Sequence, residues 1–169
     1  MSGEFDFVES DLRPGLSVIE ASAGTGKTYA ISHLVPRLLL DGTVQHLGEI
    51  LLVTFTKDAA RELSDRVRRV LEKLQASPAA DERATEPGVH RLREKFSSSR
   101  ITSVIGQALL DLDRLQVSTI HSFCQRTLQS EGTLCGLPVA PELIPDANDL
   151  IDESLYELWE RKIAADPLA

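Results

Sequence analysis

A glycine-rich stretch near the start of the chain has the residue types needed to hold the phosphates of a nucleotide. Residues 20–28 read EASAGTGKT, and in them Gly24 and Gly26 are followed directly by Lys27 and Thr28. Small residues allow successive backbone N–H groups to turn toward phosphate oxygens. The lysine can reach the β- and γ-phosphates of ATP, and the threonine hydroxyl can bind Mg²⁺. The stretch therefore predicts a phosphate-binding loop.

The segments on either side of this loop favour the same interpretation. The apolar run LSVIE (16–20) predicts a buried strand, and residues 27–40 have helical periodicity. A helix N-terminus directly after the loop favours bound anions. Ala21 stands where the general pattern G-x-x-x-x-G-K-[ST] has glycine, and alanine is tolerated there if its φ is negative. The expected nucleotide-binding residues are Ala21, Ser22, Ala23, Gly24, Thr25, Gly26, Lys27 and Thr28.

Two further strand ends carry hydroxyl groups. The apolar run EILLVTF (49–55) leads through a Thr-Phe-Thr sequence into a helix, and QVSTI (116–120) leads into a helix that begins near Ser122. Open α/β sheets bind ligands at the carboxyl ends of their strands. Hydroxyls and helix amides suit phosphodiester oxygens, and an aromatic ring such as that of Phe55 suits base stacking. The alternative is that Phe55 lies in the core and the threonines only cap their helices.

The remaining periodicity alternates between strands and helices. Besides residues 27–40, helical patterns cover about 57–75, 89–97, 102–115, 122–131 and 150–163. Residues 76–88 have no periodicity and predict an exposed loop. The continuously apolar run at 49–55 is typical of a parallel strand covered on both faces. This order predicts an α/β layered fold with a parallel sheet flanked by helices.

Composition and charge narrow the function classes. The 169 residues are 42% hydrophobic and 26% charged, as in one soluble domain. No apolar run is long enough for a membrane helix, and two cysteines are too few for a disulfide framework, so a cytoplasmic protein without a membrane partner is expected. The net charge of −8 is concentrated in residues 1–15 and 141–169, which leaves residues 16–140 at +1. A nucleic-acid partner is therefore not excluded.

Other chemistry is poorly supported by the residue pattern. His121 and Cys124 offer only two metal ligands, which is too few for a zinc site, and no third group is evident to orient a Cys-His nucleophile. Hydrolysis of ATP needs an acidic residue that orients Mg²⁺ and water. The sequence ALLDLD (108–113) is the one candidate for that acidic motif, but its leucines fit a helix better than a buried strand.

Taken together, the three polar sequences carry a family resemblance. EASAGTGKTYAI, ILLVTFTKDAARELSDRVR and STIHSFCQR, in this order and at these separations, resemble motifs I, Ia and Ib of superfamily 1 helicases of the UvrD type. The residues of these motifs are most similar to those of the RecB-like branch, the beta subunit of exodeoxyribonuclease V, in which the loop opens with alanine. PELIPDANDLIDESLYELWERK also resembles the RecB segment after motif Ib. The UvrD pattern usually has a glutamine upstream of the loop, whereas the first Gln here is Gln45.

The resemblance implies a P-loop NTPase (RecA-like) fold and a separate role for each motif. Motif I would bind ATP, with Lys27 at the phosphates and Thr28 holding Mg²⁺. Motifs Ia and Ib would contact single-stranded DNA or duplex DNA ends. The residues carried over for DNA contact are Thr54, Phe55, Thr56 and Lys57 from motif Ia, and Thr119, His121, Ser122 and Phe123 from motif Ib.

The resemblance also implies a domain organisation. Residues 1–131 would form the N-terminal part of a first motor domain, and residues 132–169 a connection and the start of an inserted helical subdomain. The family's later motifs are absent, so we expect a portion of an ATP-dependent DNA helicase that acts in recombination and repair, with partner subunits of an exonuclease V-like complex. Alone, it is expected to lack meaningful ATPase activity. The alternatives are a P-loop kinase or phosphotransferase and a non-catalytic nucleotide- or DNA-binding module.

Overall fold

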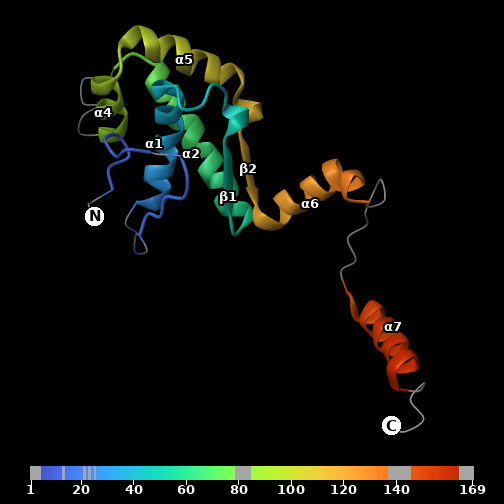
Figure 1. Ribbon diagram of the computed structural model, residues 1–169. Coiled ribbons are helices and arrows are strands. Elements are labelled where there is room, and N and C mark those ends of the chain that lie inside the picture. The colour runs from blue at the N-terminus through green and yellow to red at the C-terminus, as the bar shows by residue number, and fades with distance from the viewer. Residues whose placement is uncertain are drawn as a thin grey trace. The chain divides into compact units, whose positions relative to one another are not determined.

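A computed structural model describes residues 5–12, 14–20, 22, 24, 26–78, 85–136 and 146–163 (Figure 1). The chain divides into two compact units, residues 1–124 and 125–169, and the division falls within a helix. The predicted boundary after residue 131 stays a prediction.

Helices α1 (Lys27–Asp41) and α2 (Lys57–Gln75) form the centre of the first unit. The helix predicted at residues 57–75 is confirmed in α2, and its six buried residues are all apolar and lie at helical spacing: Ala60, Leu63, Val67, Val70, Leu71 and Leu74. On its outer face Arg66 contacts Glu62 at 2.7 Å. In α1 the polar residues Ser32, His33 and Arg37 are buried together with Val35, Leu39 and Leu40. Packing therefore surrounds much of α1.

The sheet consists of two parallel strands, β1 (Leu51–Thr54) and β2 (Gln116–Thr119). Their register pairs Leu51 with Gln116 and Thr54 with Thr119. Helix α2 packs on both strands. The prediction of a β1 strand covered on both faces is wrong: Leu52 is half-buried, but Leu51 and Val53 on the other face are 39% and 43% exposed. One face of this sheet faces the core and the other does not.

The strand predicted at residues 16–20 is not formed. These residues have no regular secondary structure, and Leu16 and Val18 are 93% and 78% exposed. A strand is stabilised by a ladder of hydrogen bonds to a neighbour. Within the described residues β1 and β2 pair only with each other, so this segment has no strand beside it. The α/β class is confirmed in its coarse form, and the described residues form a parallel sheet of two strands.

Helices α4 (Pro87–Lys95) and α5 (Ser98–Leu110) complete the first unit. They begin and end a few residues earlier than the sequence predicts. Helix α5 packs on α1 and α2, and α4 packs across the same pair (Figure 1). The core between the four helices includes Leu40, Leu71, Leu92 and Ile105, each at most marginally exposed. A 3-10 turn over Leu112–Arg114 then leads into β2.

The second unit contains most of helix α6 (Ile120–Glu131), a 3-10 turn over Gly132–Cys135, α7 (Asn148–Leu158) and a π turn over Trp159–Ile163. The predicted amphipathic helix is formed in α7. The apolar residues of α7 and of the π turn are exposed, with Leu155 at 57% and Trp159 at 57%. Among the helices described, none has the length and apolar character required to cross a membrane.

Candidate nucleotide and DNA interface

The glycine-rich loop leads directly into α1. Gly24 and Gly26 have φ values of +80° and +88°, which glycine adopts without strain and other residues rarely adopt. Gly26 is the N-cap of α1, so the helix begins at Lys27. Ala21, Ala23 and Thr25 lie outside the described residues. The two glycines thus bend the backbone as a phosphate-binding loop requires.

The start of α1 is suited to an anion. Gly26 has no side chain to cap the helix, and the first turn contains no acidic residue. The first N–H groups of a helix lack intrahelical acceptors and carry a partial positive charge. The Lys27 ammonium folds back across the loop and donates to the Ser22 carbonyl oxygen at 2.6 Å. Lys27 and Thr28 are both exposed, so the residues present fit the phosphates and Mg²⁺ of ATP.

The second group of predicted residues lies where β1 ends and α2 begins. Thr56 is the N-cap of α2, and its hydroxyl accepts the Ala59 N–H at 3.1 Å. The Thr54 hydroxyl donates to the Thr56 carbonyl oxygen at 3.0 Å. Between them, the Phe55 ring is 90% exposed. The alternative that Phe55 is a core residue is therefore wrong, whereas the capping role of Thr56 is confirmed.

Motif Ib has the same architecture after β2. The Thr119 hydroxyl donates to the Ser122 hydroxyl at 2.9 Å and accepts the Ser122 N–H at 3.2 Å. Thr119 is only 7% exposed, so its side chain stabilises the start of α6 and presents little surface. His121 is exposed, and Ser122 and Phe123 are half-buried. Thr119 could contact DNA directly only through the small part of its surface that reaches solvent.

The three motifs lie at the same end of the first unit. Figure 1 shows the first turns of α1, α2 and α6 at the end where both strands finish. The register that pairs Thr54 with Thr119 makes the second and third motifs neighbours. Lys57 is the first residue of α2 and is exposed at this edge. One edge thus combines three helix N-termini, several hydroxyls, two lysines and an exposed aromatic ring.

Acidic groups for hydrolysis are not gathered at this edge. Within the described ranges, no three His, Cys, Asp or Glu side chains lie together as a metal site. The ALLDLD sequence forms the end of α5 and the following 3-10 turn, which confirms its helical interpretation. Cys124 is an exposed free cysteine. In its described part, the structure therefore combines the candidate phosphate-binding loop with no cluster of acidic residues that could hold a metal.

An aromatic cluster behind the first turn of α1 was missed by the sequence reasoning. The Tyr29 and His33 rings lie 4.1 Å apart between centroids, and the Phe7 ring lies 5.8 Å from Tyr29. Burial lowers the pKa of His33, although its Nδ1 contact with the Tyr29 carbonyl opposes this change. The i, i+4 spacing of Tyr29 and His33 was the available signal.

Comparison with known proteins identifies the class of this fold and site. The sequence model of the UvrD/REP helicase N-terminal domain matches residues 9–166, and the chain belongs to this helicase family.

Within that family, the chain is similar to proteins named RecBCD enzyme subunit RecB, which confirms the RecB-type resemblance. It is 37% identical to the Mycobacterium tuberculosis protein over 139 residues, covering 81% of this chain. It is 34% identical to the Escherichia coli K12 protein over 155 residues, covering 87% of this chain. In both comparisons the match covers 13% of the relative, so the chain spans a small part of these proteins.

Proposed function

We propose that this chain is the ATP-binding N-terminal portion of an ATP-dependent DNA helicase that unwinds DNA in recombination and repair. The observation that carries the proposal is that α1 begins at the same end of the first unit at which the paired strands β1 and β2 finish. A motor protein needs its nucleotide site and its DNA-binding site on connected elements, so that a structural change at the nucleotide site also moves the DNA-binding site. Helix α2 provides this connection, because it packs on α1 and on both strands.

At the nucleotide site, each residue has a distinct role. The amides of the loop and of the first turn of α1 would bind the β-phosphate, and Lys27 would leave the Ser22 carbonyl to neutralise the phosphates. Thr28 would provide one oxygen ligand to Mg²⁺. Bound MgATP supplies the phosphoanhydride bond whose hydrolysis drives movement. A P-loop alone binds this substrate without orienting the attacking water.

At the DNA site, backbone contact and stacking would act together. The N-termini of α2 and α6 would bind phosphodiester oxygens, with Thr56 and Ser122 presenting hydroxyls beside them. Phe55 would stack on a base, because its ring is almost entirely in solvent. Lys57 and His121 would lie along the same strand. Such contacts depend little on base sequence, as a translocating motor requires.

The parent protein would supply the rest of the motor. The relatives are named as subunits of a RecBCD enzyme, and we propose that the longer protein assembles with partner subunits in the cytoplasm. The 169-residue chain alone would bind ATP weakly and lack meaningful ATPase or unwinding activity. A hydrolysis rate comparable to that of an intact motor, and dependent on Lys27, would contradict this part of the proposal.

Fluorescence anisotropy with labelled single-stranded DNA tests the proposed function. We expect binding at low salt that weakens as salt rises, because phosphate contacts release counterions. Phe55→Ala should reduce the affinity at every salt concentration without changing the salt slope. Absence of DNA binding at low salt, with MgATP binding intact, would contradict the helicase proposal and favour a P-loop kinase.

A further inference from the structure

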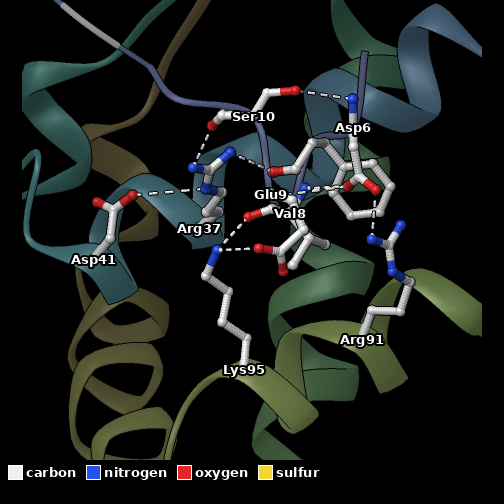
Figure 2. Close-up of polar contacts among 9 residues, drawn as sticks. Asp6, Val8, Glu9, Ser10, Arg37, Asp41, Arg91 and Lys95 are labelled. Atoms are coloured by element: carbon white, nitrogen blue, oxygen red, sulfur yellow. Dashed lines mark hydrogen bonds and ion pairs between the residues drawn. The ribbon is translucent and has the colours of Figure 1, made fainter. Parts of the chain in front are cut away.

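The segment from Phe5 to Leu12, here called the N-terminal strap, is bound to α1 through a buried arginine. Arg37 is only 6% exposed, and its guanidinium donates to the carbonyl oxygens of Phe7 at 2.8 Å and Ser10 at 2.6 Å (Figure 2). An arginine buried on one helix thus bonds to two main-chain carbonyls about thirty residues away. These contacts fix the strap's backbone and do not depend on an acidic partner in the strap.

Two basic residues of α4 hold the strap from the other side. Lys95 donates to the Val8 carbonyl oxygen at 2.5 Å, and Arg91 donates to the Asp6 carboxylate at 2.5 Å (Figure 2). The same carboxylate accepts the Val8 N–H at 2.8 Å, which closes a turn within the strap. Burial raises the pKa of Asp6, but its hydrogen bonds with Arg91 and backbone N–H groups outweigh this and hold it below its usual value.

The strap also reaches the first turn of α1. The Phe7 ring packs edge-on against Tyr29, with the ring planes at 79°, and the Arg91 guanidinium lies 5.6 Å from the Phe7 centroid. Phe7 is 9% exposed and Val8 is 1% exposed. Tyr29 follows Lys27 and Thr28 in the sequence and lies in the same helical turn. The strap therefore contacts α1 at two places: at Tyr29, next to the candidate phosphate-binding residues, and at Arg37, two turns later.

Residues 13–26 join the strap to the start of α1, so both ends of this stretch are anchored on one helix. Anchoring both ends of a loop removes much of the conformational freedom that it would otherwise lose on binding a ligand. We infer that the N-terminal strap pre-organises the nucleotide-binding loop, with Phe7 and Arg37 acting as positioning residues. This inference rests on the proposed nucleotide-binding function and adds residues far from the phosphates to it.

Two measurements on the complete 169-residue chain test the inference. MgATP affinity is measured by calorimetry, and amide hydrogen exchange is measured for peptides covering residues 14–28. Arg37→Met and Phe7→Leu should each weaken MgATP binding by about fivefold and accelerate exchange in residues 14–28. Exchange in α2 and α5 should stay unchanged. Arg37→Lys, which retains one donor group, should recover part of the affinity.

Arg93→Met is the matched control. Arg93 lies on α4 and donates to the carbonyl oxygens of Lys73 and Ala76, each at 2.6 Å, so it holds a different segment in the same manner. Arg93→Met should leave MgATP affinity within about twofold of the wild type, since Lys73 and Ala76 lie outside the strap. If Arg37→Met fails to fold, Lys95→Met removes the contacts with the Val8 carbonyl and the Glu9 carboxylate from the less buried side of the strap.

The outcomes separate the strap from the proposed function. Unchanged affinity and unchanged exchange in folded strap variants would overturn the inference, as would accelerated exchange spread evenly over α1, α2 and α5. If wild type and Lys27→Ala bind MgATP equally or not at all, the proposed function fails. In that case, hydrogen exchange in residues 14–28 of the strap variants alone tests the inference. Selective acceleration there would support the strap as the element that orders this loop, and unchanged exchange would overturn the inference.

Discussion

Thr54 and Thr119 are paired in register as the last residues of β1 and β2, yet their hydroxyls have different partners. Thr54 donates along its own chain to the Thr56 carbonyl, whereas Thr119 both donates to and accepts from Ser122 at the start of α6. Thr119 is consequently a helix-capping residue. Its influence on bound DNA would pass through the position of Ser122 and of the α6 amides.

Thr119→Val should destabilise the chain because it removes this cap. Loss of a threonine cap costs about 1 kcal/mol in the free energy of unfolding. Thr54→Val is the control of identical chemistry, and it should cost less because the Thr56 carbonyl that it frees is exposed. Urea denaturation followed by circular dichroism measures both. Equal stability losses in the two variants would contradict the difference in roles.

The role assigned to Phe55 depends on its ring face and not on its apolar bulk. Phe55→Leu retains apolar surface but removes the stacking face, and should weaken binding to single-stranded DNA by about tenfold. Phe55→Tyr retains the face and should bind almost as the wild type does. Anisotropy titrations with one labelled oligonucleotide compare the three proteins. A leucine variant that binds as tightly as the tyrosine variant would exclude base stacking.

The helices and the polar edge could be predicted because their determinants are local. Helix α2 has apolar residues at helical spacing, a threonine N-cap and charged outer positions, and all of these lie within twenty residues. The exposed position of Phe55 could not be decided, because an aromatic residue after a strand suits a core and a ligand site equally well. Its exposure depends on what packs beside it.

Features that depend on distant partners were mispredicted or missed. Residues 16–20 have the composition of a strand, but a strand needs a neighbour, and periodicity does not reveal whether one is present. The N-terminal strap has no helical or strand pattern. It is held by Arg37, Arg91 and Lys95, which bind it from positions roughly 30 to 90 residues further along the chain.

Stability should fall at mildly acidic pH because of His33. Its ring is 2% exposed, its Nε2 atom has no hydrogen-bond partner, and burial lowers its pKa below the usual 6.5. The unfolded chain then binds a proton more readily than the folded chain. The free energy of unfolding should be constant above about pH 6.5 and decrease as the pH falls below it.

His33→Leu should remove this dependence whatever its effect on absolute stability. Urea midpoints at several pH values between about 5 and 8 compare the variant with the wild type, and subtraction cancels the contributions of the other histidines. Asp6 titrates below this range, because its pKa is held below 3.8. An identical pH profile in both proteins would contradict the assignment to His33.

Gly88 on α4 lies against the rings of Tyr29 and His33. A Cβ atom at this position would lie 2.5 Å from the His33 ring and 2.5 Å from the Tyr29 hydroxyl oxygen. Gly88→Ala should therefore destabilise the chain by about 1–3 kcal/mol, because the His33 ring is buried and packs against the Tyr29 ring. Gly106→Ala is the matched helical control: its Cβ would meet only the flexible Gln75 side chain, at 3.3 Å.

Gly106→Ala should leave stability unchanged or raise it, because alanine is the better helix former. Thermal unfolding compares the two glycine variants. Equal and small effects would mean that α4 does not pack on the aromatic cluster as described.

The central claim is that one chain carries separate sites for a nucleotide and for DNA at one edge. Parallel titrations with MgATP and with labelled single-stranded DNA test it on Lys27→Ala and Phe55→Ala. Lys57→Ala, the lysine that opens α2 as Lys27 opens α1, is the control for nucleotide binding. Lys27→Ala should weaken MgATP binding by about tenfold or more and leave DNA binding intact, while Phe55→Ala does the reverse and Lys57→Ala retains MgATP affinity. MgATP binding that is equal in Lys27→Ala and the wild type would contradict the account.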